Sequence, residues 1–236
     1  MMLLCPSHHD AATHNAMSIA AQRRYKAAPH NIQAGLAHGQ LSTSQNYAAI
    51  AIGQSALVGD GAFFAIDGEE LLRIGLDDNG EILLSASLKD RDGREIATIV
   101  DNEWLSGDPS VWDMTSSWGR LKIWTGSRKI AFELVSRFHP VTVRADLWHN
   151  GACMRLGKDG ISFFAPGSVL ANPSLPDVGL AGMGVNLNTE VKKFSLDAYE
   201  GLGLIVGSDG DVRERVQKTV HAWNKLKHPA FFRESE

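Results

Sequence analysis

The chain has 236 residues, of which 21% are charged and 44% are hydrophobic, and its formal net charge is −4 at pH 7. This length allows one large domain with a small appendage, and the composition is that of a globular protein with a buried core. The acidic balance excludes a chain that is basic throughout, so any nucleic-acid-binding surface has to be local. Two cysteines exclude a disulfide framework and favour a reducing, cytoplasmic location. No apolar run approaches the ~20 residues that a transmembrane helix needs, so we expect no membrane partner.

The first 46 residues differ in composition from the rest and are rich in histidine, alanine, glutamine and serine. A helix is expected from Ser18, a good N-cap, to Lys26, and Pro29 ends it. The same stretch carries six potential metal ligands, which are Cys5, His8, His9, His14, His30 and His38.

The stretch Cys5-Pro6-Ser7-His8-His9, followed by Asp-Ala-Ala-Thr, resembles the closing half of the HNH endonuclease motif. In that ββα family two cysteine pairs hold a structural zinc, a first histidine is the general base, and the last histidine binds the catalytic divalent metal. The resemblance implies that Cys5 and His8 form half of a zinc site, with His8 in place of a cysteine. It makes His9 the catalytic-metal ligand.

The resemblance covers about the first 30 residues, because AMSIAAQRRYKAAPHNI is similar to the helix and Lys-x-x-Pro exit that follow the motif in many bacterial HNH proteins. It makes DNA a candidate partner, and the candidate nucleic-acid contacts on this helix are Arg23, Arg24 and Lys26.

The upstream half of the motif, with its cysteine pair, its first histidine and its Asn-Leu loop, is absent from this sequence. Phosphodiester hydrolysis requires both a base for the water and a metal for the leaving oxygen, so His9 alone does not make a nuclease. We therefore expect a chain that starts inside an HNH unit, with a partial structural zinc site and a divalent metal such as magnesium only if it is active. The alternative is that Cys5, His8 and His9 belong to a polar tail without a metal.

The clearest structural pattern lies in residues 81–124, which are expected to form strand, turn, strand, loop and strand. Four apolar residues alternate with mostly polar ones in the first strand, a period of two that places one apolar row on one face of a sheet: Ile82, Leu84, Ala86 and Leu88. Asp90-Arg91-Asp92-Gly93 is a turn sequence, and the strand Glu95–Val100 returns toward Trp104, which is expected to pack inward.

Further strands are expected on both sides of this stretch, at 47–52, 62–66, 71–76, 130–134, 141–147 and 161–164. Asn150-Gly151 is the strongest short hairpin signal in the chain. Residues 166–207 are expected to be a long irregular connection or a few short strands with bends, and GLAGMG at 179–184 a loop. An amphipathic helix is expected after Asp211. Its basic side chains are expected to be solvated, with contact to a nucleic-acid backbone as the alternative: Arg213, Arg215, Lys218, Lys225 and Lys227.

Two other interpretations rest on acidic residues. A calcium loop needs its glycine at the sixth position, whereas the Asp-rich stretches at 77–80 and 90–93 have it at the fourth, so both are predicted to be turns. Acids beside tryptophans are what glycosidases use, so a sugar cleft is an alternative to core tryptophans and solvated acids. The residues concerned are Glu103, Asp108, Asp113, Trp104, Trp112 and Trp118.

The sequence thus predicts a mainly β protein, with an antiparallel barrel-like or sandwich domain at 47–207. A short His-rich helical segment precedes it at 1–46, and an amphipathic helix with a tail follows at 208–236. Two functions remain open. One is a truncated HNH-endonuclease-like protein whose β domain serves binding or assembly, a hydrolase only if the missing half of the motif is supplied. The other is a non-catalytic cytoplasmic binding or assembly module, and a homo-oligomer is compatible with both.

Overall fold

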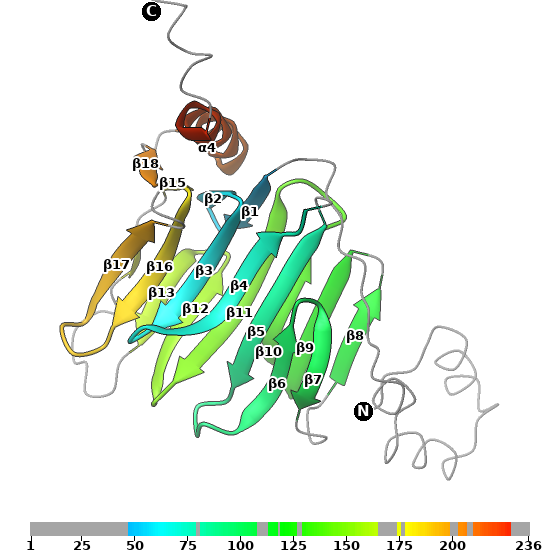
Figure 1. Cartoon of the computed structure of the whole chain (residues 1–236). Coiled ribbons are helices and arrows are strands. Elements are labelled where there is room, and N and C mark those ends of the chain that lie inside the picture. Colours follow the sequence, from blue (N-terminus) through cyan, green and yellow to red (C-terminus); the bar gives the residue numbers. More distant parts are fainter. Residues whose placement is uncertain are drawn as a thin grey trace, which may run out of the picture.

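The computed structural model describes residues 47–78, 81–107, 113–117, 119–126, 129–164, 174–175, 178–198, 203–206 and 210–227. Two β-sheets lie face to face, and a helix, α4, lies at the outer side of the larger one (Figure 1). The mainly β class and the C-terminal helix are therefore confirmed, while the expected N-terminal helical segment falls outside the described residues.

The smaller sheet has seven strands in the order β17-β16-β3-β4-β5-β6-β7. Only the β16·β3 pair is parallel among these neighbours. The strand bounds are β3 Gly61–Ile66, β4 Glu69–Leu76, β5 Ile82–Lys89, β6 Glu95–Val100, β7 Glu103–Gly107, β16 Met183–Asn188 and β17 Lys193–Ala198.

The larger sheet has eleven strands, and β11 is its branch point. One edge of β11 pairs with β10, whereas the opposite edge is shared by β1, at Val141 and Thr142, and by β12, from Ala145 to His149. From there one arm runs β12-β13-β14, a second runs β1-β2-β15-β18, and a third runs β10-β9-β8. The bounds are β1 Ala48–Ile52, β2 Ser55–Gly59, β8 Asp113–Ser117, β9 Arg120–Gly126, β10 Lys129–Val135, β11 Val141–His149, β12 Ala152–Gly157, β13 Gly160–Phe164, β14 Ser174–Leu175, β15 Gly179–Ala181 and β18 Leu204–Val206.

The period-two pattern of the sequence explains how the sheets pack. Along β5 and along β11 buried residues alternate with more exposed ones. In β1 the isoleucines Ile50 and Ile52 point into the core between the sheets, whereas Ala49 joins a second cluster beneath the helix. Large side chains therefore fill the sandwich, and small ones on the other side allow the helix to approach the sheet closely.

Turn chemistry accounts for the hairpins. Asn150 and Gly151 both have positive φ, 48° and 76°, as a two-residue β-hairpin turn requires, so the strongest hairpin signal is confirmed. Asp101 and Asn102 also have positive φ, 47° and 68°, and turn β6 directly into β7, where the sequence predicted a loop. Trp104 packs against the core, as predicted.

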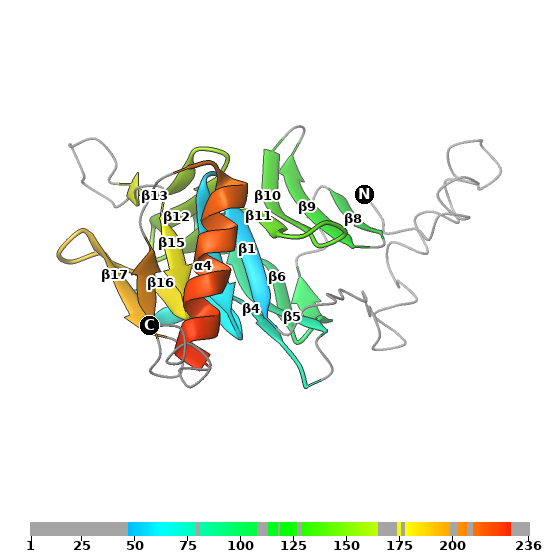
Figure 2. The same cartoon turned by 90° about the horizontal axis from the view of Figure 1, so that it is seen from above.

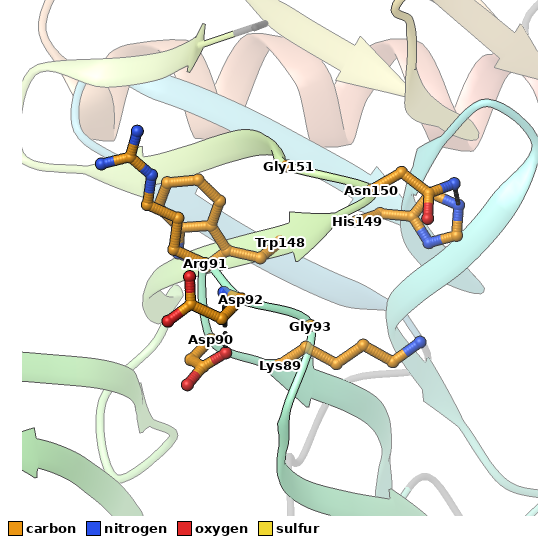
Figure 3. A pocket seen from close by; sticks show the side chains of 9 residues that line it. All are labelled: Lys89, Asp90, Arg91, Asp92, Gly93, Trp148, His149, Asn150 and Gly151. Atoms are coloured by element: carbon orange, nitrogen blue, oxygen red, sulfur yellow. Dashed lines mark hydrogen bonds between the residues drawn. The ribbon is translucent and has the colours of Figure 1, made fainter.

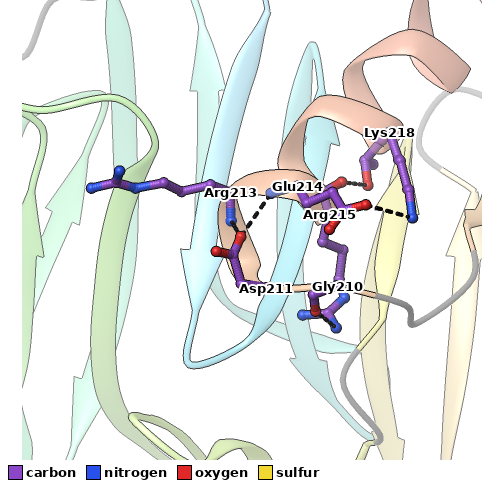
Figure 4. Close-up of polar contacts among 7 residues, drawn as sticks. Gly210, Asp211, Arg213, Glu214, Arg215 and Lys218 are labelled. Carbon is purple, nitrogen blue, oxygen red and sulfur yellow. Dashed lines mark hydrogen bonds and ion pairs between the residues drawn. The ribbon is translucent and has the colours of Figure 1, made fainter.

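Helix α4 (Val212–Lys227) begins directly after Asp211, where the sequence predicts a helix. Asp211 Oδ1 accepts hydrogen bonds from the backbone N–H of Arg213 at 2.9 Å and of Glu214 at 3.0 Å (Figure 4). These bonds hold the pKa of Asp211 below its usual value, and the bond from the Glu214 N–H contributes most. The helix lies across β1 and β15 (Figure 2) and also contacts β2 and β18, with Trp223 in the small cluster beneath it.

The expectation that all basic side chains of this helix are solvated is wrong at Arg215. This side chain is buried, and its guanidinium donates to the carbonyl oxygen of Gln54. It also donates to the carbonyl oxygen of Gly210, which lies close to Arg215 in Figure 4. Lys227 forms an ion pair with Asp60 at the other end of the helix. Arg215 and Lys227 therefore tie the helix to the sandwich, which leaves less of their charge for another molecule.

Three details of the predicted β domain change. The sheets are mixed, because β1·β11, β2·β15 and β3·β16 are parallel pairs. In the part of the chain that the structure describes, the sheets form a sandwich and no closed barrel. Of the two alternatives for residues 166–207, the described part has the short strands, whereas the loop predicted at 179–184 is wrong, because β15 lies within it. None of the described helices is long and apolar enough to cross a bilayer.

Candidate functional site

The site residues predicted from the sequence lie outside the described residues. These are Cys5, His8 and His9 of the HNH-like segment and the basic residues Arg23, Arg24 and Lys26. Within the described ranges, no three His, Cys, Asp or Glu side chains come together as a metal site. Among the described residues, a group of aromatic and basic side chains lies on the outer side of the larger sheet, away from α4.

The outer face of strands β9 to β13 presents aromatic and basic side chains in register. Ala145 and Leu147 point into the core, so the residues between and beside them, Arg144, Asp146 and Trp148, point outward. On β9, Lys122 and Trp124 flank the buried Ile123 and point the same way. We call this surface the aromatic face; it consists of Lys122, Trp124, Arg144, Trp148, Arg155 and Phe164.

Cross-strand pairing fixes the order of these side chains. Trp148 lies opposite Cys153 on β12, which in turn lies opposite Phe164 on β13, so a small thiol separates two aromatic rings. Burial raises the pKa of the Cys153 thiol to about 12, which keeps it protonated and makes it a poor nucleophile. Cys153 is therefore a structural part of the face and carries none of its chemistry.

Two basic side chains lie over aromatic rings of this face. The Lys122 ammonium is 4.6 Å from the centre of the Trp124 ring, and the Arg155 guanidinium is 5.1 Å from the centre of Phe164. Such cation–π contacts hold long flexible side chains against rigid rings. The face therefore offers positive charge and flat apolar surface side by side.

The acidic side chains on the face are already neutralised. Asp146 accepts from Arg155 through both carboxylate oxygens, at 2.8 and 3.3 Å. Glu133 is held by Arg120 and by Lys122, the latter at 3.6 Å. Arg144, exposed between these two groups, has no ion pair among the described residues. It is the basic group of this face that is most available to an anion.

A pocket lies where the aromatic face ends. It has a volume of about 330 Å³ and lies between the β5–β6 turn and the β11–β12 turn (Figure 3). Trp148 belongs both to the face and to the pocket wall. The two features therefore form a continuous surface.

Trp104 is not available to line a sugar cleft, the alternative that the sequence left open. Trp104 packs against the core, and Gly107 lies against its ring so closely that no side chain fits there. Glu103 lies beside it on β7, while Asp108, Trp112 and Trp118 lie outside the described residues. Of the two interpretations, a core tryptophan is the correct one for Trp104.

No family model, no curated protein sequence and no solved structure matches this chain.

Sequence reasoning did not identify the aromatic face, although the signal is present. The alternation of Val141, Val143, Ala145 and Leu147 with polar residues indicates a half-buried strand. The polar side of that alternation ends in Trp148, an aromatic residue where solvent-exposed positions are usually small or charged. Comparing the outward positions of neighbouring strands would have brought Trp148 and Phe164 together, but this requires the pairing that only the structure provides.

Proposed function

We propose that this chain is a nucleic-acid-associated protein whose β-sandwich binds single strands through the aromatic face. The observation that carries this proposal is the arrangement of Trp124, Trp148 and Phe164 with Lys122, Arg144 and Arg155 on an outer sheet face that α4 leaves uncovered. Nucleotide bases stack on aromatic side chains regardless of sequence, while lysine and arginine pair with phosphates.

The local nature of the charge supports a single strand over a duplex as the ligand. The chain as a whole carries a net charge of −4, and of the cations on the face only Arg144 is neither in an ion pair nor over a ring among the described residues. A duplex hides the faces of its bases and requires many phosphate contacts, whereas a single strand exposes bases to the rings. The resemblance of the N-terminal segment to an HNH unit supports nucleic acid as the general class of ligand.

The HNH-like segment is proposed as a partial metal site without full nuclease activity. Cys5 and His8 would supply two of the four ligands that a structural zinc takes, so any zinc should bind weakly. His9 would hold a catalytic metal such as magnesium, but the general base is missing, and loss of such a base costs about 10²–10⁴-fold in rate. We expect the purified chain to leave plasmid DNA uncut with magnesium, manganese, nickel or zinc. Cutting that disappears in His9→Ala would contradict this.

The binding proposal is tested by fluorescence anisotropy with labelled single-stranded oligonucleotides about 12 residues long. Trp124→Ala removes one stacking platform, and a base stacked on an aromatic ring contributes about 1–3 kcal/mol, so the affinity should fall by roughly 5- to 150-fold. Arg144→Ala removes one phosphate contact and should reduce the dependence of the affinity on salt by about one ion.

Lys193→Ala is the matched control, because Lys193 is an exposed cation on β17 of the smaller sheet. It changes the net charge as Arg144→Ala does but leaves the aromatic face intact, so its affinity should remain that of the natural chain. If Lys193→Ala weakens binding as much as Arg144→Ala, the attraction is only a general charge effect. If no oligonucleotide binds at low salt, the proposal is wrong.

Assembly of several copies is the second candidate, and the exposed edge strand β18 favours it. Leu204 and Ile205 on this strand are 44% and 56% exposed, and in the described residues β18 pairs only with β15. An open strand edge with apolar side chains is a template for pairing with another chain. If copies associate there, light scattering with size-exclusion chromatography should give an oligomer that Ile205→Lys converts to a monomer.

A further inference from the structure

The pocket at the end of the aromatic face is formed by two tight turns. Lys89 to Gly93 close the β5–β6 hairpin on the smaller sheet, and Trp148 to Gly151 close the β11–β12 hairpin on the larger one. Its volume of about 330 Å³ lies at the lower end of the 300–1,000 Å³ typical of small-molecule sites. The lining residues are Lys89, Asp90, Arg91, Asp92, Gly93, Trp148, His149, Asn150 and Gly151 (Figure 3).

The backbone of the first turn is fixed by its own side chain. Asp90 Oδ1 accepts from the backbone N–H of Asp92 and of Arg94, both at 2.9 Å, and the N–H of Gly93 donates to the Asp90 carbonyl at 3.1 Å. The Asp90 carboxylate is therefore engaged in the turn. The side chains of Lys89, Arg91 and Asp92 extend from a backbone that a ligand does not need to reorganise.

The pocket has two sides of different chemistry. In Figure 3 the side chains of Arg91 and Trp148 lie on one side, and those of Lys89, His149 and Asn150 lie on the other. A planar ring can stack on the Trp148 indole, with the Arg91 guanidinium, itself planar, beside it. On the other side, the Lys89 ammonium supplies a positive charge for an anion.

The remaining polar groups complement such a ligand. The Asn150 amide donates to His149 Nε2 at 2.9 Å, which orients the imidazole at the cationic side. Asp92, in contrast to Asp90, has no backbone hydrogen bond to its carboxylate among those described, so its oxygens are acceptors for ring N–H or amino groups. Aromatic platform, acceptor and cation together match a base that carries a phosphate.

We infer that this pocket binds a nucleoside monophosphate group, with the base against Trp148 and the phosphate near Lys89. The group is either a free nucleotide or the phosphorylated end of a nucleic-acid strand. The second source rests on the proposed function, because the strand would continue from Trp148 along the aromatic face; the first source is independent of it.

The test is isothermal titration calorimetry of the full chain with the four ribonucleoside monophosphates, the matching nucleosides and inorganic phosphate. At least one monophosphate should bind, and Lys89→Ala should weaken it about tenfold while leaving the affinity of its nucleoside unchanged. Trp148→Ala should weaken nucleotide and nucleoside alike, with Trp148→Phe retaining most of the affinity if the ring itself is what matters. Lys158→Ala is the matched control, because Lys158 is an exposed cation at the β12–β13 turn, outside the pocket.

The two sources are separated with oligonucleotides that carry a 5′-phosphate, a 3′-phosphate or only hydroxyl ends. A phosphate-dependent gain in affinity that Lys89→Ala abolishes identifies a strand end, whereas tighter binding of the free monophosphate identifies a free nucleotide. Trp124→Ala should reduce oligonucleotide binding but not monophosphate binding, so failure of the aromatic face is distinguishable from failure of the pocket. The inference is overturned if no monophosphate binds at millimolar concentration, or if Lys89→Ala and Trp148→Ala bind it as the natural chain does.

Discussion

Replacing Trp223 with alanine tests whether α4 is an integral part of the sandwich. Trp223 is 3% exposed and lies in the cluster beneath the helix with Ala49, Ala56 and Val58, while the Lys227 ammonium lies 5.0 Å from the centre of its ring. The sheet side chains beneath the indole are small, so they can fill only part of the space that it leaves. We therefore expect a large loss of stability from this single change.

The magnitude follows from the buried surface. A buried tryptophan removes about 150–250 Å² from water, which at about 25 cal/mol per Å² corresponds to roughly 4–6 kcal/mol as an upper estimate. Measured Trp→Ala changes cost about 3–5 kcal/mol. Because the helix covers an outer face and can shift toward the sheet, we expect the lower end, about 3 kcal/mol. In a domain of this size that lowers Tm by about 6–12 °C.

The assay is urea unfolding followed by far-ultraviolet circular dichroism, since Trp223 is itself a fluorophore. Gln217→Ala, on the exposed side of the same helix, is the control and should change the free energy of unfolding by less than about 0.5 kcal/mol. A loss below about 1 kcal/mol for Trp223→Ala would show that the helix is not anchored by this residue. An early separate transition, with the main one unchanged, would show that α4 detaches without unfolding the sandwich.

Three further changes test individual contacts. The Cys153 thiol, whose pKa is raised to about 12 by burial, should escape labelling by maleimide in the folded chain and react after denaturation, as peptide mass mapping would show. Hydrogen bonds from the Thr189 hydroxyl and, second, from its backbone N–H lower the pKa of Asp67. The ionised Asp67 therefore stabilises the folded chain above pH ~4, and this contribution is lost as the pH falls through the lowered pKa. In Thr189→Val the free energy of unfolding, measured as a function of pH, should fall less steeply over this acid range. Gly53→Ala places a methyl group against the β12–β13 turn at positive φ and should cost more than about 2 kcal/mol in thermal unfolding, whereas Gly68→Ala, also at positive φ but in open space, should cost about 1–2 kcal/mol.

Local patterns predicted the elements of this fold well. The alternation in residues 82–88 and the turn Asp90–Gly93 correspond to β5, its turn and β6, because period and turn chemistry are properties of neighbouring residues. The same holds for Asn150-Gly151 and for the start of helix α4 after Asp211. Each of these features is decided within a few residues of itself.

The parallel pairs could not be predicted in the same way. β2 pairs with β15, and β3 with β16, across roughly half of the chain, and nothing near Ala56 or Phe64 specifies such a partner. Arg215 was misjudged for a related reason. Its spacing on the helix fits a solvated position, but its environment is set by Gln54 at the β1–β2 turn, a residue from the other end of the described chain.

The candidate site residues also differ in whether local sequence or long-range pairing determines them. The HNH-like residues are recognised from a local motif, and their roles remain predictions. The aromatic face and the pocket are instead assembled by pairing: Trp148 and Phe164 are brought together through Cys153, and Arg91 and Trp148 through two turns on different sheets. Such a site has no continuous signature in the chain.

The three parallel pairs also bear on how the chain reaches this structure. β1, β2 and β3 are synthesised early, yet their partners β11, β15 and β16 follow only in the second half of the chain. During synthesis, Ile50, Leu57 and Phe64 therefore emerge long before the strands that cover them exist. Closing such distant pairs carries a large entropic cost, which is typical of domains that fold in milliseconds to seconds. The N-terminal strands then remain exposed to wrong partners until β11, β15 and β16 have been synthesised, and recovery of correctly folded chain should depend on holding these strands apart in the meantime.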